Sequence, residues 1–188
     1  PDHRNSFIGQ AYLSCSIKDS MRTQPDPQSQ STSLTAHGPI RNPDAVLHYL
    51  ATVTPSMSAG MTMSLFLNAN HTPVGYCHYP VTLFRQSGPT PKDIFRAATS
   101  VSTVFVILIQ QHPTQGTGPF DIGDEQRQQA SKYALAGQLL DIPVLDYMVI
   151  NDTHRVSLLI DDRDELNRVA KEYVQRLANP LNIDPCRN

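Results

Sequence analysis

The stretch STVFVILIQ at residues 102–110 constrains the fold of this chain more than any other segment. It is almost continuously apolar and rich in branched side chains, with no alternation between polar and apolar positions. Such a run is typical of a strand at the centre of a sheet that is covered on both faces. The sequence therefore predicts a layered domain with helices on both sides of a sheet.

The rest of the chain supplies those helices and the neighbouring strands. Asn42 before Pro43 indicates a capped helix start, and Thr90 with Asp93 resembles a capping box in which Asp replaces the usual Glu. We predict helices over 43–53, 91–100, 121–140 and 162–178. Strands are predicted over 61–68, 73–81, 102–110, 144–150 and 155–160. The order α-β-β-α-β-α-β-β-α indicates one α/β (α+β) domain with a mixed sheet.

The two ends of the chain differ in composition from this domain. Residues 1–39 are rich in Ser, Gln, Thr and Pro and are predicted to form a flexible arm, in which the more apolar 6–17 forms a short docked segment. The ordered domain is expected over 40–180, including the C-terminal helix, and 181–188 is expected to be a tail.

Charge and cysteine content narrow the class of protein. A net charge of −2 gives no overall attraction to nucleic acid or to an anionic membrane, and no apolar run is long enough to span a bilayer. The N-terminus lacks the pattern of a signal peptide. Cys15, Cys77 and Cys186 are few and far apart, so we expect three free thiols and a cytoplasmic protein.

Three segments together resemble the RadC-type proteins of the JAMM/MPN metalloprotease superfamily. The first is TPKDIFRAATSVSTVFVILIQQHPTQG (90–116), which is similar to a capped helix and an apolar strand ending in His-Asn-His-Pro-Ser-Gly. The others are LAGQLLDIPVLDYMVIND (135–152) and SLFLNANHTPVGY (64–76), in the family's order. The resemblance covers about 40–160 and implies a three-layer α/β/α fold with a mixed central sheet, of the cytidine-deaminase-like type.

The resemblance also implies where a metal site would lie. Family members hold zinc with two histidines and one aspartate, and water takes the fourth position. His112 matches the second histidine, whereas the first falls on Gln110. Asp124 matches the aspartate if the loop is one residue longer than in the family, and Asp121 then takes the place of the family's serine. Without that extra residue the two positions are Gly123 and Phe120.

The family's general base is a glutamate on the first strand, and its position here is Gly60. The chain has only three glutamates, Glu125, Glu165 and Glu172, and all of them follow the histidine. Without a positioned base, the rate of such a hydrolysis typically falls by about 10²–10⁴. A neutral glutamine is also a weak ligand for zinc. We therefore expect no catalytic residue here and only a vestigial metal site.

Each of these residues also has an ordinary structural explanation. His112 can be a strand-end histidine that bonds to the backbone, and Gln110 and Gln111 can be polar residues at a strand end. Asp121 and Asp124 can cap the following helix or interact with its dipole. Tyr147 takes the position of a further family histidine.

Three functional hypotheses follow. The first is a catalytically inactive RadC-like protein that acts as an interaction or scaffold module, with an unidentified protein partner and no cofactor. The second is a zinc-dependent peptidase or isopeptidase with an atypical Gln110, His112 and Asp124 site. The third, a DNA-repair accessory protein, rests only on the family's name, and the slight acidity of the chain counts against it. The oligomeric state is open.

Overall fold

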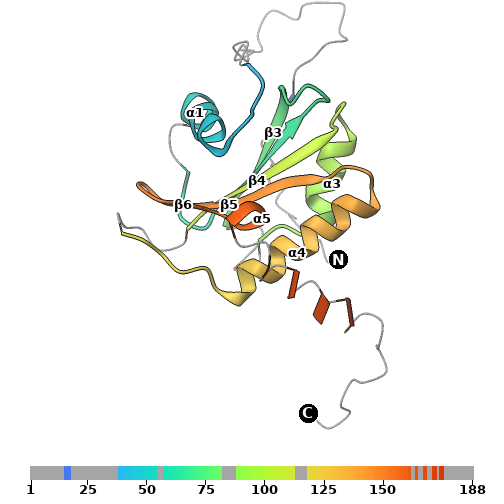
Figure 1. The fold of residues 1–188 in the computed structure, drawn as a ribbon. Coiled ribbons are helices and arrows are strands. Elements are labelled where there is room, and N and C mark those ends of the chain that lie inside the picture. The colour runs from blue at the N-terminus through green and yellow to red at the C-terminus, as the bar shows by residue number, and fades with distance from the viewer. Residues whose placement is uncertain are drawn as a thin grey trace, which may run out of the picture.

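The fold is a mixed six-stranded sheet with helices on both faces (Figure 1). In the order β1-β3-β2-β4-β5-β6, only β4 and β5 are parallel neighbours. The structure is a computed structural model, and it describes residues 15–17, 38–54, 57–81, 88–112, 118–161, 164, 167, 168, 171, 172, 174 and 175. The predicted three-layer arrangement with a mixed sheet is confirmed, and β4 takes the central place that its apolar run predicted.

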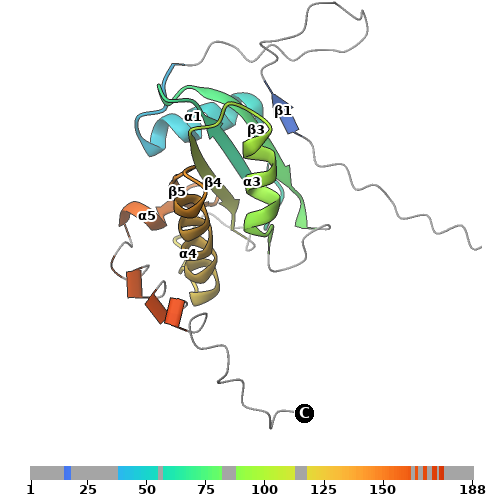
Figure 2. The same cartoon turned by 90° about the vertical axis from the view of Figure 1, so that its right-hand side faces the viewer.

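The strands and helices lie close to the predicted ranges. The strands are β1 (Cys15–Ile17), β2 (Thr62–Leu67), β3 (Pro73–Tyr79), β4 (Phe105–Gln111), β5 (Val144–Ile150) and β6 (Arg155–Ser157). The helices are α1 (Pro43–Val53), α3 (Pro91–Thr99), α4 (Asp124–Leu139) and α5 (Leu158–Asp161). Helix α1 covers one face of the sheet, whereas α3 and α4 cover the other (Figures 1 and 2).

Two apolar cores follow from this layering, one on each face of the sheet. The α1 core contains Tyr49 and Leu50 of the helix together with Met63, Leu65 and Ile109 of the sheet. The core on the other side contains residues of α3 and α4 together with the alternate residues of the same strands, Phe66, Leu108, Tyr147 and Val149 among them. Because successive strand residues point to opposite faces, one run of apolar residues in β4 serves both cores.

Local capping signals place the helix starts. The Asn42 side chain accepts a hydrogen bond from the backbone N–H of Ala45 at 2.8 Å. At α3, the Thr90 side chain accepts from the Asp93 backbone N–H, and the Asp93 carboxylate accepts from the Thr90 backbone N–H at 2.9 Å. Both predicted caps are confirmed, including the capping box with Asp in place of Glu.

Three predicted boundaries are wrong by three residues, and the first is the start of β4, which lies at Phe105 and not at residue 102. Helix α4 begins at Asp124 and not at Asp121, because Gly123 occupies the N-cap position and its N–H is bound by the Gln126 side chain at 2.7 Å. The segment 158–160 was predicted to continue a strand, but it belongs to the helical turn α5. The turn forms where the Asp161 carboxylate accepts a hydrogen bond from the backbone N–H of Ser157 at 3.2 Å. The apolar residues of 158–160 do not by themselves indicate this interaction.

The N-terminal strand lies outside the predicted domain range. β1 pairs with the edge of β3 and falls within 6–17, where a docked segment was predicted; the other residues of 1–37 and those of 181–188 lie outside the described residues. Cys77 of β3 is disulfide-bonded, so the prediction of three free thiols is wrong for this residue. Both outermost strands, β1 and β6, have three residues each.

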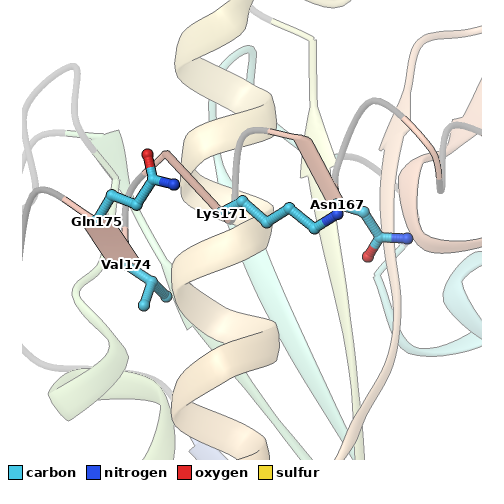
Figure 3. A pocket seen from close by; sticks show the side chains of 4 residues that line it. All are labelled: Asn167, Lys171, Val174 and Gln175. Atoms are coloured by element: carbon cyan, nitrogen blue, oxygen red, sulfur yellow. The ribbon is translucent and has the colours of Figure 1, made fainter.

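Part of the predicted last helix is described. Residues 164, 167, 168, 171, 172, 174 and 175 are helical. Arg168 and Glu172 form an ion pair at 2.6 Å, in agreement with a solvated face of mixed charge. Asn167, Lys171, Val174 and Gln175 line a pocket of about 490 Å³ (Figure 3). Within the described part of the chain, no helix combines the length and apolarity that crossing a bilayer requires.

Candidate functional site

Gln110 and His112, two of the residues singled out from the sequence, lie at the C-terminal end of β4. Gln110 is paired with Thr62 of β2 on one side and with Val149 of β5 on the other. Its side-chain oxygen accepts a hydrogen bond from the Tyr147 hydroxyl at 2.8 Å. The two residues that replace family histidines therefore contact each other directly.

Tyr147 is held in the core between β5 and α4. Its exposed fraction is 2%, and its ring lies 5.8 Å from the ring of Tyr133. Tyr133 in turn donates a hydrogen bond to the carbonyl oxygen of Pro89 at 2.5 Å. Burial, followed by the proximity of Tyr133 and Glu125, raises the pKa of Tyr147 well above its ordinary value. The hydroxyl therefore keeps its proton at neutral pH and acts as a donor to Gln110.

His112 follows β4 directly and is fixed through its backbone and its ring. Its backbone N–H donates to the carbonyl oxygen of Ile150 at 2.7 Å, which continues the pairing of β4 with β5. Its ring stacks on Phe120, with centroids 4.5 Å apart and an angle of 27° between the planes. His112 therefore lies at the end of the strand pairing, with its ring packed against an aromatic side chain.

The two aspartates lie at the start of α4. Asp124 is the first residue of the helix, its side chain is 75% exposed, and its carboxylate lies 3.6 Å from the Arg127 guanidinium. Its place in the first turn agrees with the predicted interaction with the helix dipole. Asp121 is exposed in the preceding loop, and the capping role considered for it is wrong because Gly123 is the N-cap.

Gly60 lies beside the end of β4, where the resemblance places the family's base. Its N–H donates to the carbonyl oxygen of Gln111 at 3.0 Å, and the Gln111 N–H donates to Met61 at 2.9 Å. The backbone of Gly60 has a φ of +74°, which favours glycine. A Cβ at this position would meet Cγ2 of Val81 at 3.0 Å. Both the conformation of Gly60 and its surroundings disfavour a side chain at this position.

The donor set does not fit a zinc ion well. Zinc sites use thiolate, imidazole and carboxylate ligands, and a catalytic site needs three of them with one open position. Here the set would be one imidazole, one neutral amide already bonded to a tyrosine, and one exposed carboxylate paired with arginine. Among the residues that the structure describes, no three His, Cys, Asp or Glu side chains are grouped so that they could hold one metal ion.

Two contacts of this site were not predicted from the sequence. The hydrogen bond of Gln110 with Tyr147 depends on the register of two parallel strands that are distant in sequence. The stacking of His112 on Phe120 joins two side chains that are eight positions apart in the sequence. The match of Tyr147 to a family histidine was the one feature of the sequence that could have indicated its contact with Gln110. No feature of the sequence indicated the stacking of His112 on Phe120.

Two surface pockets lie elsewhere in the molecule. One is the pocket of the last helix (Figure 3), and the other, of about 170 Å³, is lined by residues at the start of α1, the His71 turn, β4, β5 and α5. The lining of neither includes Gln110, His112 or Asp124. The candidate residues therefore do not form the wall of either pocket.

Comparison with known proteins gives a consistent result. The sequence matches the family described as RadC-like JAB domain over residues 40–165. It is 27% identical to a UPF0758 protein of Alkaliphilus metalliredigens over 68% of this chain and 53% of the relative. It is 31% identical to a UPF0758 protein of Leptothrix cholodnii over 62% of this chain and 51% of the relative. The chain thus spans about half the length of the curated relatives it matches.

Proposed function

Because the chain belongs to the RadC-like JAB domain family, we propose that it is a non-catalytic member that acts as a protein-interaction module. The observation that carries this proposal is the hydrogen bond of 2.8 Å from the Tyr147 hydroxyl to the Gln110 side chain. The resemblance places a zinc-binding histidine at the Gln110 position and a further histidine at the Tyr147 position. In this chain a neutral donor and a neutral acceptor replace them and satisfy each other.

This replacement disfavours a metal ion on two grounds. A glutamine oxygen carries no charge, and in this chain one of its lone pairs is already used by the Tyr147 hydroxyl. A cation placed there would compete with a buried hydroxyl whose proton is retained at neutral pH. Removing Tyr147 from this bond would leave its hydroxyl without its partner in a closely packed core, which costs free energy.

The missing base is the second support for the proposal. Gly60 lies next to the Gln111 backbone, where the family's glutamate would face the metal, but it offers no proton acceptor. A water molecule near His112 would therefore have no carboxylate from the Gly60 position to take its proton. A chain that lacks both the first histidine and the base keeps the fold without the reaction.

Metal content is the measurement that tests the proposal. The full chain is purified with zinc supplied, and bound zinc is measured by atomic emission for the unchanged protein and for His112→Ala. His48→Ala is the matched control, because His48 is an exposed residue of α1, a helix that supplies none of the candidate residues. We expect much less than one zinc per chain in all three proteins, with no difference between them.

The zinc-peptidase alternative makes the opposite prediction. It requires about one zinc per chain, lost in His112→Ala and retained in His48→Ala, together with cleavage of a peptide or isopeptide bond. That result would contradict the non-catalytic proposal. No observation on the described residues favours this alternative, and none favours duplex DNA as the partner.

The interaction role is supported by apolar side chains on the surface. Leu139 and Leu140 at the end of α4 are 78% and 50% exposed, and Ile160 of α5 is 57% exposed. We test this role by cross-linking in cells, comparing the unchanged chain with Leu139→Ser/Leu140→Ser. Val104→Ser, at another partly exposed apolar position, is the control. A partner whose yield falls only in the leucine variant supports the module; equal yields of every partner contradict a role for this surface.

A further inference from the structure

The pairing of β1 with β3 calls for an explanation, because the strand is short and its partner is distant in sequence. Cys15, Ser16 and Ile17 lie opposite Cys77, Tyr76 and Gly75 in antiparallel register. Figure 2 shows β1 alongside β3 at the margin of the sheet. Pairing β1 with β3 closes a long loop, which costs conformational entropy, and three residues make only a few backbone hydrogen bonds in return. The attachment of β1 is therefore weak. An additional link would stabilise it.

Cys77 supplies such a link. It is fully buried in the core shared with α3 and α4, and it is disulfide-bonded. The register places Cys15 directly opposite it. Opposed residues of antiparallel strands have Cα atoms about 4.5–5.5 Å apart, which lies within the range that a disulfide can bridge. The third cysteine, Cys186, lies outside the described residues.

We propose that Cys15 is the disulfide partner of Cys77, and that this bond is a redox-dependent anchor that holds β1 on the edge of β3. In the oxidised chain β1 covers the backbone groups of β3. In the reduced chain β1 leaves, and β3 becomes the outermost strand of the sheet. This inference does not depend on whether the metal site works, because Cys77 takes no part in it.

The chemistry is a thiol–disulfide exchange with a small disulfide such as oxidised glutathione. One cysteine thiolate attacks a glutathione sulfur, which breaks the S–S bond and releases one glutathione thiolate. The second cysteine thiolate then attacks the mixed disulfide and releases the other. The two cysteines lose two electrons, the glutathione disulfide gains them, and the two thiol protons end on the two glutathione molecules. A dithiol reductant reverses the reaction.

Peptide mapping of the full chain tests the identity of the bond. Trypsin separates the three cysteines, because it places Cys15 in peptide 5–18, Cys77 in 42–85 and Cys186 in 177–187. After equilibration with oxidised glutathione and digestion without reductant, we expect 5–18 joined to 42–85, and no such species after reduction. A link from 42–85 to 177–187, or Cys77 found only as a thiol or a glutathione adduct, would overturn the proposal.

Hydrogen exchange tests the anchoring. We expect reduction to accelerate amide exchange within 73–79 by about tenfold or more, while exchange within 105–111 of the central strand stays the same. Cys15→Ser should have the accelerated exchange under both conditions, and Cys186→Ser, the matched control, should behave like the unchanged chain. If Cys15→Ser does not fold, the reduced unchanged chain carries the test. Equal exchange in the oxidised and reduced unchanged chains would show that the bond does not anchor β1.

Discussion

Asp146 and Tyr147 are neighbours on β5, yet they belong to opposite faces of the sheet and to different parts of the molecule. Asp146 is 4% exposed, and its carboxylate accepts a hydrogen bond from the Ser157 hydroxyl at 2.5 Å and one from the Leu159 backbone N–H at 3.4 Å. Tyr147, on the α4 side, donates to Gln110. Both are buried polar groups with partners, but they serve different parts of the fold.

The two residues differ in what their side chains support. Asp146 connects β5 to the turn from β6 into α5, so the local fold depends on its carboxylate. The residue at Tyr147 only has to fill space and satisfy its hydroxyl, which Gln110 allows. Asp146 thus supports the backbone of the turn, whereas Tyr147 packs in the core and bonds to Gln110. Substitutions of these two residues should therefore lower the free energy of unfolding by different amounts.

Asp146→Ala is expected to have the largest effect. It removes both hydrogen bonds and leaves the Ser157 hydroxyl and the Leu159 N–H without this acceptor in a buried place. The free energy of unfolding should fall by about 2–3 kcal/mol, measured by urea denaturation. Asp152→Ala, in an exposed turn, should change it by less than about 0.5 kcal/mol. Equal effects of the two variants would contradict the structural role of Asp146.

Gly60→Ala and Gly60→Glu probe the family's base position. Both place a Cβ at a φ of +74° and 3.0 Å from Val81 Cγ2. Both should lower the free energy of unfolding by about 1–2 kcal/mol. Because the alanine variant has the same backbone strain, it is the control for any activity of the glutamate variant. Zinc-dependent peptide cleavage by Gly60→Glu alone would show that only the base is missing, contrary to our proposal.

Tyr147→Phe tests the other face of β5. It removes the hydroxyl that Gln110 accepts from, and the free energy of unfolding should fall by about 1 kcal/mol. A double-mutant cycle with Gln110→Leu measures the interaction itself, and we expect a coupling of about 1 kcal/mol. Additive effects of the two substitutions would mean that the bond contributes nothing to stability.

The smallest expected effect is a pH dependence that belongs to Asp146. Burial raises the pKa of this carboxyl in spite of its hydrogen bonds from Ser157, Leu159 and Tyr147. The folded state therefore keeps the proton at a pH where the unfolded state, with a pKa of about 3.9, has lost it. Stability then falls as the pH rises from the unfolded to the folded pKa. The difference in unfolding free energy between the unchanged chain and Asp146→Asn should shrink over this range; a constant difference would contradict the shift.

Local rules predicted much of the fold. Asn42 and the Thr90–Asp93 pair cap their helices as expected, and the predicted strand 144–150 coincides with β5, because these features depend on neighbouring residues. The segment after Ser157 was predicted to be a strand because its letters are apolar. Its turn depends on the carboxylates of Asp146 and Asp161, which local apolar spacing does not report.

The sequence indicated which residues belong to the candidate site, but it did not predict their side-chain contacts. The resemblance indicated Gly60, Gln110 and His112 as site positions, and in the structure all three lie at the same end of β4. The bond of Gln110 to Tyr147 arises from the register of β4 with β5, and the stacking of His112 on Phe120 joins side chains that are not neighbours in the sequence. The disulfide of Cys77 was missed for the same reason, because β1 joins β3 across a long stretch of sequence.

The short outermost strands also bear on how the protein behaves when concentrated. A long exposed edge strand can pair with strands of further chains, and this leads to aggregates. Edge strands of three residues, such as β1 and β6, offer few backbone groups for such pairing. If β1 is lost, the seven residues of β3 take its place at the margin. Concentrated samples kept with strong reductant should then become turbid sooner than oxidised ones.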